Sequence, residues 1–575
     1  MRRYVTFAAL GLLALAGFRL AGQPADNAAR PGEPTLEVPT LVCLGVRCPV
    51  AGDANGNATV ALDYRRVGET EWRGALPLFR CETAALLRKP AEGVALFAGS
   101  VFDLRPDTDY ELRLRLTDPD GGSVTRTLRA HTRAEPQAAP DARIVHVKPG
   151  NGGGSGTEAD PYLGLDSAQA AAEPGDLMLL HAGVYPGTWS VTKSGESGRP
   201  IVWRGAGDGE SVIDGGGAER ALSANGMHHV YFEGLSVRNA RWGIVAHEAA
   251  DLVIRRCHFY DLESGFTATR DAPHMLRFFF ADNTVDGRCT WPRSKGIEPN
   301  EGFELAGEGH VVCYNRIRGC ADGISIREGQ PSSAIDIYNN ELSECTDDGI
   351  ELDYGEQNIR CFRNRLTNCF MGISTQPLYA GPCYIFRNAL YNIGLETFKL
   401  HNGVSGVLAY HNTSVKQGMA LIVYTGETVS NSVFRNNLFL GSDGNYAMEL
   451  TSPMRDCDFD YNGFAGGPFR LFAKWNDVRY ATLDDVQKSG ALEAHGVWAE
   501  AGACFASGVG APSELARQFE VAVNDLRLAQ NSGAVDKGAA LPNINDGFAG
   551  AAPDLGAYEY GSQLDHYGPR PTKGR

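Results

Sequence analysis

"RCFRNRLTNCFMGIS", residues 360–374, joins two short apolar strands through an asparagine, and this pattern recurs along the chain. The asparagine returns at intervals of 25, 24, 24, 24 and 24 residues, as Asn315, Asn340, Asn364, Asn388, Asn412 and Asn436. A period near 24 with short strands is typical of a solenoid in which each repeat forms one coil. The repeat therefore predicts an all-β fold, a parallel β-helix.

The recurring asparagines are expected to be structural. Asparagine tolerates the left-handed conformation of tight turns, and in a stack of coils its amide can hydrogen-bond the asparagines above and below. We therefore expect each of them to occupy a left-handed turn and to form a ladder. Cys320, Cys345 and Cys369 recur with a similar period and are expected to be small core residues rather than metal ligands.

A second column follows the asparagines by seven or eight residues and shows which side chains share a face. Its inward members are Ile324, Ile350, Ile373, Phe398 and Leu421. Because side chains alternate along a strand, the residues one and three positions later point outward. These outward pairs are Glu304 and Ala306, Ser325 and Arg327, Glu351 and Asp353, Ser374 and Gln376, Lys399 and His401, and Ile422 and Tyr424. Coils stack about 4.8 Å apart, so the pairs are expected to form one surface strip.

The start of the chain, "MRRYVTFAALGLLALAGFRLAGQ", has two arginines, an apolar run and small residues near Ala21. This pattern predicts a cleavable signal peptide over residues 1–22. No later apolar run reaches membrane-spanning length, so we expect a secreted or periplasmic protein without membrane insertion.

Charge and cysteine content limit the partners. The formal net charge of −16 argues against a nucleic-acid partner. An anionic ligand would need local positive charges at its binding site, because the overall field of the protein repels it. The thirteen cysteines cannot all pair within the chain. Cys43, Cys48 and Cys81 lie close together in sequence, and one disulfide among them is expected in an oxidising compartment. We expect a monomer.

Composition divides the chain into two units. Residues 36–135 alternate apolar strands with turns, and "LRPDTDYELRLRLTD" (104–118) resembles the tyrosine corner of a fibronectin type III sandwich, with Tyr110 as its tyrosine. A Pro/Ala-rich linker covers 132–142. Residues 143–562 begin with a short helical segment, Leu165–Ala172, that looks like the N-terminal cap of right-handed parallel β-helix enzymes. Residues 563–575 are expected to form a disordered tail.

"TDDGIELD", residues 346–353, carries an unusual density of acidic side chains on this strip. Stacking the coils places Asp322 beside Asp347, Asp348 and Glu351, four carboxylates on two adjacent coils. Like charges so close repel unless a cation lies among them, and hard oxygen ligands of this number suit Ca²⁺. The sequence therefore predicts a calcium site formed by Asp322, Asp347, Asp348 and Glu351.

This arrangement resembles polysaccharide lyase family nine, calcium-dependent pectate-cleaving β-helix enzymes. That family places one Asp on one coil, a "DDxxD" motif on the next and a lysine base further along. Here Glu351 replaces the last Asp, and Lys399 lies two coils, about 10 Å, beyond it. The resemblance implies β-elimination of an acidic, uronate-containing polysaccharide, with Lys399 as the base that removes the C5 proton and with a pKa lowered by nearby positive charge.

The remaining strip residues receive supporting roles. Arg327 could bind a substrate carboxylate or lower the pKa of Lys399, and His401 could protonate or position the leaving oxygen. Asp353, Gln376 and Tyr424 are candidates for substrate binding. The insert at 284–302 brings Trp291, Arg293 and Lys295 to the surface, where it either walls a cleft or forms a disulfide-tied loop.

Two alternatives stay open from the residues alone. Polygalacturonase-type inverting hydrolases also place one Asp and then paired Asp residues on successive coils, but they follow them with Gly-His-Gly, where this chain has "FMGIST" (370–375). A non-catalytic surface or glycan-binding protein could carry the same two units.

Overall fold

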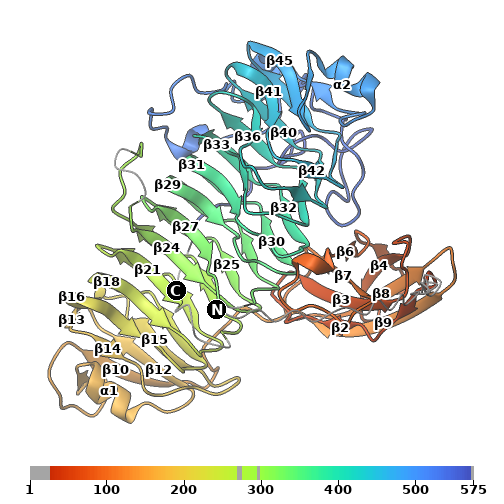
Figure 1. Ribbon diagram of the computed structural model, residues 1–575. Coiled ribbons are helices and arrows are strands. Elements are labelled where there is room, and N and C mark those ends of the chain that lie inside the picture. The colour runs from red at the N-terminus through yellow and green to blue at the C-terminus, as the bar shows by residue number, and fades with distance from the viewer. Residues whose placement is uncertain (1–25, 269–274, 294–297, 330, 572–575) are drawn as a thin grey trace, which may run out of the picture.

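The computed structural model describes residues 26–268, 275–293, 298–329 and 331–571. A small antiparallel N-terminal unit lies against the side of a long parallel β-helix (Figure 1). The signal segment, residues 1–22, lies outside the described residues. Within the described part, no helix has both the length and the apolar character needed to cross a bilayer.

The N-terminal unit consists of two antiparallel sheets with strand orders β1-β3-β7-β6, with β2 beside β3, and β5-β4-β8-β9. The Tyr110 hydroxyl accepts a hydrogen bond from the Arg105 backbone N–H at 2.9 Å. The fibronectin type III identity of this unit stays a prediction. Its strands are β1 (Arg30–Pro31), β2 (Thr35–Leu36), β3 (Leu44–Ala51), β4 (Thr59–Arg66), β5 (Arg73–Gly74), β6 (Phe79–Arg80), β7 (Val94–Val101), β8 (Asp109–Thr117) and β9 (Ser123–His131).

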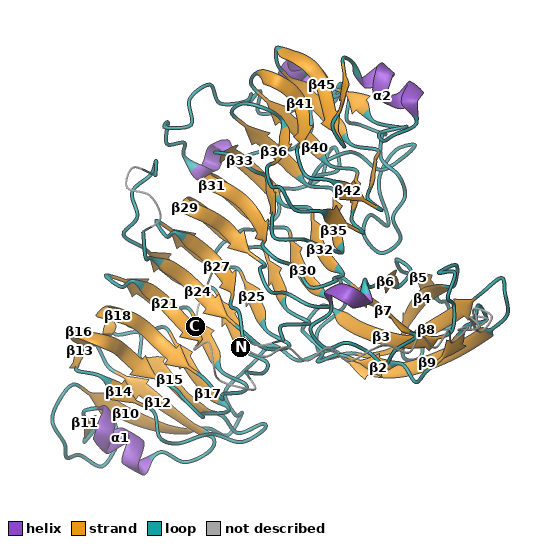
Figure 2. Cartoon of the chain, in the orientation of Figure 1, coloured by secondary structure: helices purple, strands orange, loops and turns teal. Residues whose placement is uncertain are grey.

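The β-helix is built from two long parallel sheets (Figure 2), which confirms the all-β solenoid that the repeat predicts. Within the described residues the first sheet has 14 strands. They are β10 (Arg143–Lys148), β11 (Tyr162–Leu163), β12 (Asp176–Leu180), β15 (Ile201–Gly205), β17 (Val230–Glu233), β19 (Val253–Arg255), β22 (Phe279–Ala281), β25 (Val311–Cys313), β28 (Asp336–Tyr338), β30 (Ile359–Phe362), β32 (Cys383–Phe386), β35 (Val407–Tyr410), β39 (Val433–Arg435) and β43 (Asp458–Asp460).

The second sheet has 18 strands in the described part of the chain. They are β13 (Gly183–Pro186), β14 (Trp189–Ser190), β16 (Ser211–Ser223), β18 (Ser236–Ala246), β20 (His258–Tyr260), β21 (Ser264–Ala268), β23 (Thr284–Asp286), β24 (Glu301–Leu305), β26 (Arg316–Arg318), β27 (Asp322–Ile326), β29 (Glu341–Glu351), β31 (Arg365–Thr375), β33 (Ala389–Ile393), β34 (Phe398–Leu400), β36 (Thr413–Lys416), β40 (Leu438–Gly441), β44 (Gly463–Gly466) and β47 (Val497–Trp498).

Shorter elements complete the two ends of the solenoid. The expected cap helix is present as α1 (Leu165–Ala171), and Ala168 and Ala172 bury into the solenoid core. At the far end the remaining elements are β37 (Leu421–Val423), β38 (Val429–Ser430), β41 (Gly444–Leu450), β42 (Met454–Arg455), β45 (Phe469–Trp475), β46 (Val478–Tyr480) and α2 (Leu483–Ser489). Short 3₁₀ turns cover Thr83–Ala85, Ala501–Ala503 and Val521–Val523.

The asparagine ladder holds the coils in register. Asn340 donates its amide to the Val312 carbonyl at 2.9 Å and to the Asn364 side-chain oxygen at 3.0 Å. The same oxygen accepts the Asn340 backbone N–H at 3.1 Å. The ladder residues are fully buried, and they are Asn283, Asn315, Asn340, Asn364, Asn388, Asn412, Asn437 and Asn462.

Two details of the predicted ladder are wrong. The left-handed conformation belongs to the residue before each ladder asparagine, for example Arg363 at φ 52°, because the ladder residue itself must direct its amide along the stack. For the same reason Asn437 replaces Asn436 in the ladder. Asn436 takes the left-handed position at φ 60° and turns its amide to the His411 ring and the Ala539 carbonyl.

The cysteines do not form the predicted disulfide. All thirteen lie within the described residues and are free thiols, Cys43, Cys48 and Cys81 among them. Each of these three is buried and contributes apolar contact to a hydrophobic cluster. Cys320 and Cys345 are fully buried in the solenoid core, as the repeat predicts.

The tail prediction is wrong for the described residues 563–571. Arg570 forms ion pairs with Asp282 at 2.8 Å and Glu135 at 2.9 Å. Tyr567 is 5 % exposed, and its hydroxyl lies 2.5 Å from the Tyr558 hydroxyl. Buried rings and paired charges fix this segment against the solenoid.

The N-terminal unit packs onto the first sheet of the β-helix. Phe102 lies edge-on to Tyr384 and Phe386, with ring centroids 4.9 and 5.0 Å away. Beside them Arg360 and Asp336, both without exposed side-chain surface, form an ion pair at 2.8 Å. Thus the unit is held by a buried interface.

We predict that Asn364→Ala lowers the free energy of unfolding by about 3 kcal/mol or more, because it leaves the buried Asn340 backbone N–H and neighbouring ladder groups without partners. Urea unfolding followed by circular dichroism measures the change. Asn151→Ala, at an exposed position, serves as the control and should change stability by no more than about 0.5 kcal/mol. Equal effects of the two substitutions would contradict a supporting role for the ladder.

Candidate functional site

The predicted columns are present on the second sheet from Ile324 to Phe398, whereas Leu421 lies on β37 in a separate four-stranded sheet and Ala306, expected to point outward, is buried in the core. Ile324 pairs with Ile350 and then with Ile373, and all three are fully buried. On the opposite face, Glu351 pairs with Ser374, which pairs with Lys399. Glycine precedes each of these three isoleucines because the coils approach closely there, and a Cβ at Gly323 would lie 2.6 Å from the Gly349 carbonyl oxygen of the next coil.

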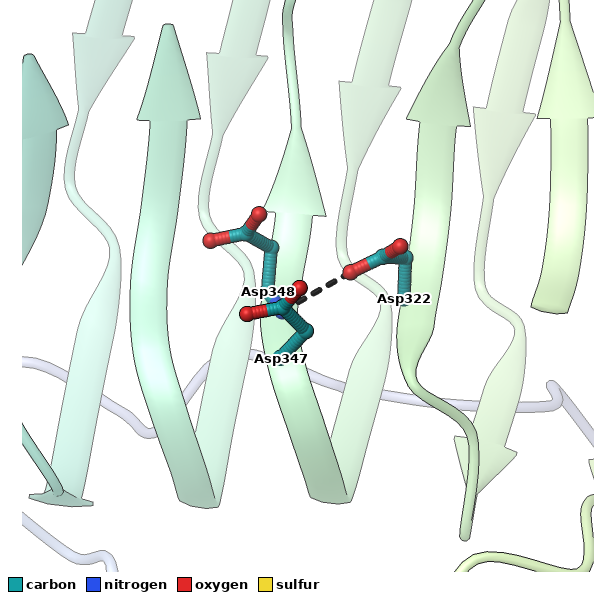
Figure 3. A group of neighbouring side chains, drawn as sticks. All are labelled: Asp322, Asp347 and Asp348. Atoms are coloured by element: carbon teal, nitrogen blue, oxygen red, sulfur yellow. Dashed lines mark hydrogen bonds between the residues drawn. The ribbon is translucent and has the colours of Figure 1, made fainter. Parts of the chain in front are cut away.

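A group of three carboxylates lies at the start of these strands. Ligand oxygens of Asp322, Asp347 and Asp348 all lie within 4.8 Å of one another (Figure 3). Strand β29 shifts register between Cys345 and Asp348, and such a bulge re-aims consecutive side chains. The Asp348 backbone N–H donates to Asp322 Oδ1 at 2.8 Å. These aspartates come from two adjacent coils, as predicted.

Glu351 lies outside this group of three. Its carboxyl instead interacts with Asp353, and burial together with the Asp353 charge raises the pKa of Glu351 to about 9. Burial also raises the pKa of Asp322 to about 7, with a further contribution from Glu351. The site thus concentrates acidic groups that resist ionisation together.

Lys399 reaches the acidic group across one coil. Its Nζ donates to Asp348 Oδ2 at 2.8 Å, and its side chain is 12 % exposed. Although burial opposes the charged form, the Asp348 carboxylate raises the pKa of Lys399 above its usual value. The lowering of this pKa expected from a bound cation stays a prediction, because the partner that the structure gives the lysine is a carboxylate.

Arg327 and Asp353 already have protein partners. Arg327 forms a close ion pair with Glu304, which also accepts a hydrogen bond from the Thr267 hydroxyl at 2.7 Å. Asp353 is 3 % exposed and accepts hydrogen bonds from the Ser374 hydroxyl at 2.7 Å and the Gln376 backbone N–H at 2.6 Å.

Gln376 and Tyr424 differ in how much surface they offer. Gln376 is half-buried, and its side-chain oxygen is buried without a hydrogen-bond partner among the described residues. Tyr424 is 64 % exposed. Near it, His401 Nε2 lies 3.1 Å from the Glu396 carboxylate. The strip therefore carries one open aromatic ring beyond Lys399.

The insert at 284–302 contacts the acidic group. The Arg293 guanidinium stacks on the Phe370 ring, 4.7 Å from its centroid, and lies 3.7 Å from Asp347 Oδ1. Trp291 is 7 % exposed rather than a surface residue, because its ring packs inward. Cys289 is a free thiol, which contradicts a disulfide-tied loop. Lys295 lies outside the described residues.

A cavity of about 320 Å³ opens beside the acidic group. Its lining residues are Glu301, Glu304, Asp322, Ser325, Ile326, Arg327, Glu328, Glu351 and Tyr354. Glu301 was missed by the sequence interpretation, although "EGFE" (301–304) aligns with "DGIS" (322–325) and places Glu301 directly opposite Asp322. Burial, then Asp322 and Glu351, raise the pKa of Glu301 to about 10.

The residues present fit a hard divalent cation. Asp348 Oδ1 and Glu301 Oε2 are both buried and have no hydrogen-bond partner in the described structure. A cation among these oxygens would offset the repulsion that raises the carboxyl pKa values, and oxygen ligands of this kind suit Ca²⁺.

Comparisons with known proteins agree with the fold. The family model described as right handed beta helix region matches residues 220–377. Pectate lyase L from Dickeya chrysanthemi is 24 % identical over 457 residues, which cover 72 % of this chain and 90 % of the relative. Pectate lyase L from Dickeya dadantii is 24 % identical over 458 residues, with the same coverage of both chains.

Solved structures give a distant match. A family 28 exopolygalacturonase from Yersinia enterocolitica aligns with a TM-score of 0.31 at 12 % identity, covering 74 % of this chain and 99 % of that one. An alginate lyase from Paenibacillus aligns with a TM-score of 0.23 at 16 % identity, covering 55 % of this chain and 96 % of that one. Scores this low say nothing about chemistry. The chain therefore carries a right-handed β-helix with weak similarity to pectate lyase L.

Proposed function

We propose that this chain is a secreted calcium-dependent polysaccharide lyase that cleaves a uronate-containing polysaccharide by β-elimination. The observation that carries the proposal is the 2.8 Å contact between Lys399 Nζ and Asp348 inside the group of three aspartates. It places a candidate base beside candidate metal ligands. The similarity to pectate lyase L over 72 % of the chain supports an acidic polysaccharide as the substrate class.

Asp322, Asp347 and Asp348 would hold the cation, with Glu301 and Glu351 close enough in register to contribute. Bound calcium would withdraw charge from the substrate carboxylate and make the C5 proton more acidic. Arg293, held flat on Phe370 at the edge of the group, would bind the substrate carboxylate with its guanidinium. Arg327 could do the same only by leaving Glu304.

Lys399 would remove the C5 proton. In the metal-free protein Asp348 keeps the lysine charged. A cation held by Asp348 would take this anionic partner from Lys399 and add a positive neighbour, and both effects would favour the neutral amine. His401 and Tyr424 lie on the following part of the strip, where the leaving sugar would be bound.

An inverting hydrolase is the second candidate. The pKa of Asp322, raised by burial to about 7, suits a carboxylic acid that protonates a leaving oxygen. Against it, the equivalent coil, Phe370–Ser374, contains no histidine, and Lys399 neutralises one carboxylate that the hydrolase would need. A non-catalytic glycan-binding protein would release no product.

One assay separates these functions. Purified protein incubated with pectate, alginate and glycosaminoglycans should release an unsaturated product that absorbs ultraviolet light. A hydrolase would release reducing ends without that absorbance. We further propose that the protein is a monomer, that residues 1–22 direct its export and that the N-terminal unit is a fibronectin type III module.

We predict that millimolar calcium raises the melting temperature, because a cation that binds the folded site stabilises it by linkage. Asp348→Ala should abolish the rise, since it removes a central ligand. Glu219→Ala, which removes an exposed carboxylate far from the site in sequence, should leave the rise intact. A wild-type protein that gains no stability from calcium, measured by differential scanning fluorimetry, would contradict a metal site.

The metal-free protein should lose stability as pH rises from about 5 to 9. The pKa values of Asp322 and Asp353 are raised to about 7 and that of Glu351 to about 9, so the folded state binds more protons than the unfolded state in this window. Stability present at acid pH is then lost as pH rises through these values. Calcium should offset the loss most strongly at pH 9. Urea unfolding with chelator and with calcium measures both trends; a calcium effect independent of pH would count against these carboxylates.

We predict that Lys399→Ala folds normally, keeps its calcium-dependent rise in melting temperature and loses at least ~100-fold in turnover, a typical share for a general base. Lys474→Ala is the matched control, because Lys474 is another lysine of this solenoid whose ion pair within the described residues is with the exposed Asp477. Near-wild-type release of unsaturated product by Lys399→Ala would contradict the assignment of Lys399 as the base and would point to Arg327 or His401 in that role.

A further inference from the structure

We infer that Glu396 is a positioning residue that orients His401 as the proton donor to the leaving oxygen; this inference rests on the proposed lyase function. The two residues flank strand β34, which carries Lys399 between them. His401 Nε2 lies 3.1 Å from Glu396 Oε2 and 3.3 Å from Oε1. Glu396 has no exposed side-chain surface, whereas the His401 side chain is 20 % exposed. A buried carboxylate thus contacts a surface imidazole.

The carboxylate is fixed on more than one side. Glu396 Oε1 also accepts the Tyr424 backbone N–H at 2.9 Å. Behind it lies Lys416, 2 % exposed, whose Nζ donates to the carbonyls of Gln417 and Met419. Burial lowers the pKa of Lys416 to about 8, and the Glu396 charge opposes that change. Hydrogen bonds to His401 and to the Tyr424 backbone N–H therefore hold the Glu396 carboxylate in place.

This contact selects one orientation of the imidazole. A carboxylate only accepts hydrogen bonds, so the proton on Nε2 points at Glu396. Nδ1 makes no hydrogen bond to any described residue. His401 directly follows the last residue of β34, two positions after Lys399, and its ring is partly exposed beside the strip. Nδ1 is therefore the ring atom left for the substrate.

The proposed step balances in protons and electrons. Lys399 takes the C5 proton, the electron pair of that bond forms the C4–C5 double bond, and the C4–O4 bond breaks. The leaving O4 takes the proton from Nδ1 of protonated His401. His401 becomes neutral, and its Nε2 keeps the proton that it donates in the hydrogen bond to Glu396. Lys399 then returns its proton to water, and His401 regains one from water.

The charged groups around His401 define the pH test. Glu396 contacts it directly, and Lys399 lies two residues before it on β34. Glu427 lies in the segment after β37, where the Thr425 hydroxyl and, to a smaller extent, the His401 charge lower the Glu427 pKa. Lys416 acts from behind Glu396. Of these, Glu396 alone hydrogen-bonds the ring among the described residues. Its removal should therefore affect His401 more than removal of Glu427.

The test measures lyase turnover against pH for wild type, Glu396→Gln and Glu427→Gln. A carboxylate stabilises the protonated ring, so in Glu396→Gln the alkaline limb of kcat should move to lower pH by roughly 1 unit. KM should stay within about twofold, because Glu396 does not touch substrate. Glu427→Gln should move the limb by less than half as much. Unchanged limbs in both variants would overturn the inference.

A second readout needs no substrate. In protein labelled with ¹³C and ¹⁵N at histidine, the resonance absent from His401→Gln identifies His401. Its neutral form should show the proton on Nε2 in wild type, and its titration midpoint should move to lower pH in Glu396→Gln. A proton on Nδ1, or no movement, overturns the pairing whatever the activity. If the wild-type protein has no lyase activity, the proposed function and the role of His401 as proton donor are both wrong. The histidine resonances then still show whether Glu396 and His401 are hydrogen-bonded.

A loss of activity in Glu396→Gln is informative only if the variant is folded. Circular dichroism and the calcium-dependent melting shift report whether Glu396→Gln is folded. If it is not, His401→Gln carries the test, because its partly exposed side chain can still hydrogen-bond Glu396. That variant should lose roughly 100-fold in kcat together with the alkaline limb. Retention of the limb in His401→Gln would exclude His401 as the donor.

Discussion

The solenoid depends on the hydrogen bonds that the side-chain amides of the ladder asparagines form from coil to coil. Asn364 donates to the Ile337 carbonyl and to Asn388, and it accepts from both the amide and the backbone of Asn340. All these groups are buried, where an unpaired donor or acceptor costs about 1–3 kcal/mol. A coil that slipped by one residue would break these bonds and turn its buried face outward. The ladder therefore fixes register for the coils from Asn283 to Asn462.

Fixed register turns separation in sequence into contact in space. Asp322 and Asp348 are far apart in the chain, yet the Asp348 backbone N–H donates a hydrogen bond of 2.8 Å to Asp322 Oδ1. Crowding of acidic side chains is unfavourable by itself, and the structure limits it in two ways. Protons are retained, as the raised pKa of Glu301 shows, and cations approach, as Lys399 and Arg293 do. A divalent cation bound among these carboxylates would take the place of the retained protons and of the Lys399 and Arg293 side chains.

The N-terminal unit occupies the other side of the solenoid. It packs on the first sheet, where Phe102 contacts Tyr384 and Phe386 and the Arg360–Asp336 pair is buried. The acidic group lies on the second sheet, on strands β27 and β29. Arg363 of the solenoid forms an ion pair with Asp103 of the N-terminal unit, and the Thr40 hydroxyl donates to the buried Asp336, so polar contacts as well as ring packing hold the two units together. The strip that carries Lys399 is left uncovered by the N-terminal unit.

The sequence by itself determined the features that repeat. In a solenoid each coil contacts only its neighbours, so a constant period is enough to predict the stacked asparagines, the inward column of Ile324 and Ile350, and the meeting of Asp322 with Asp347 and Asp348. Even Glu301 could have been found by aligning "EGFE" with "DGIS".

Only the tertiary structure decided what does not repeat. The choice of Asn437 over Asn436 depends on a one-residue difference in coil length, and the closing of Asp353 against Ser374 depends on side-chain rotation. The approach of Arg293 comes from an insert without counterpart in other coils. Lys399 reaches Asp348 because a long side chain crosses a coil, and that reach is set by packing rather than by period. Periodicity fixes where each Cα lies, whereas the direction of a side chain depends on its neighbours in three dimensions.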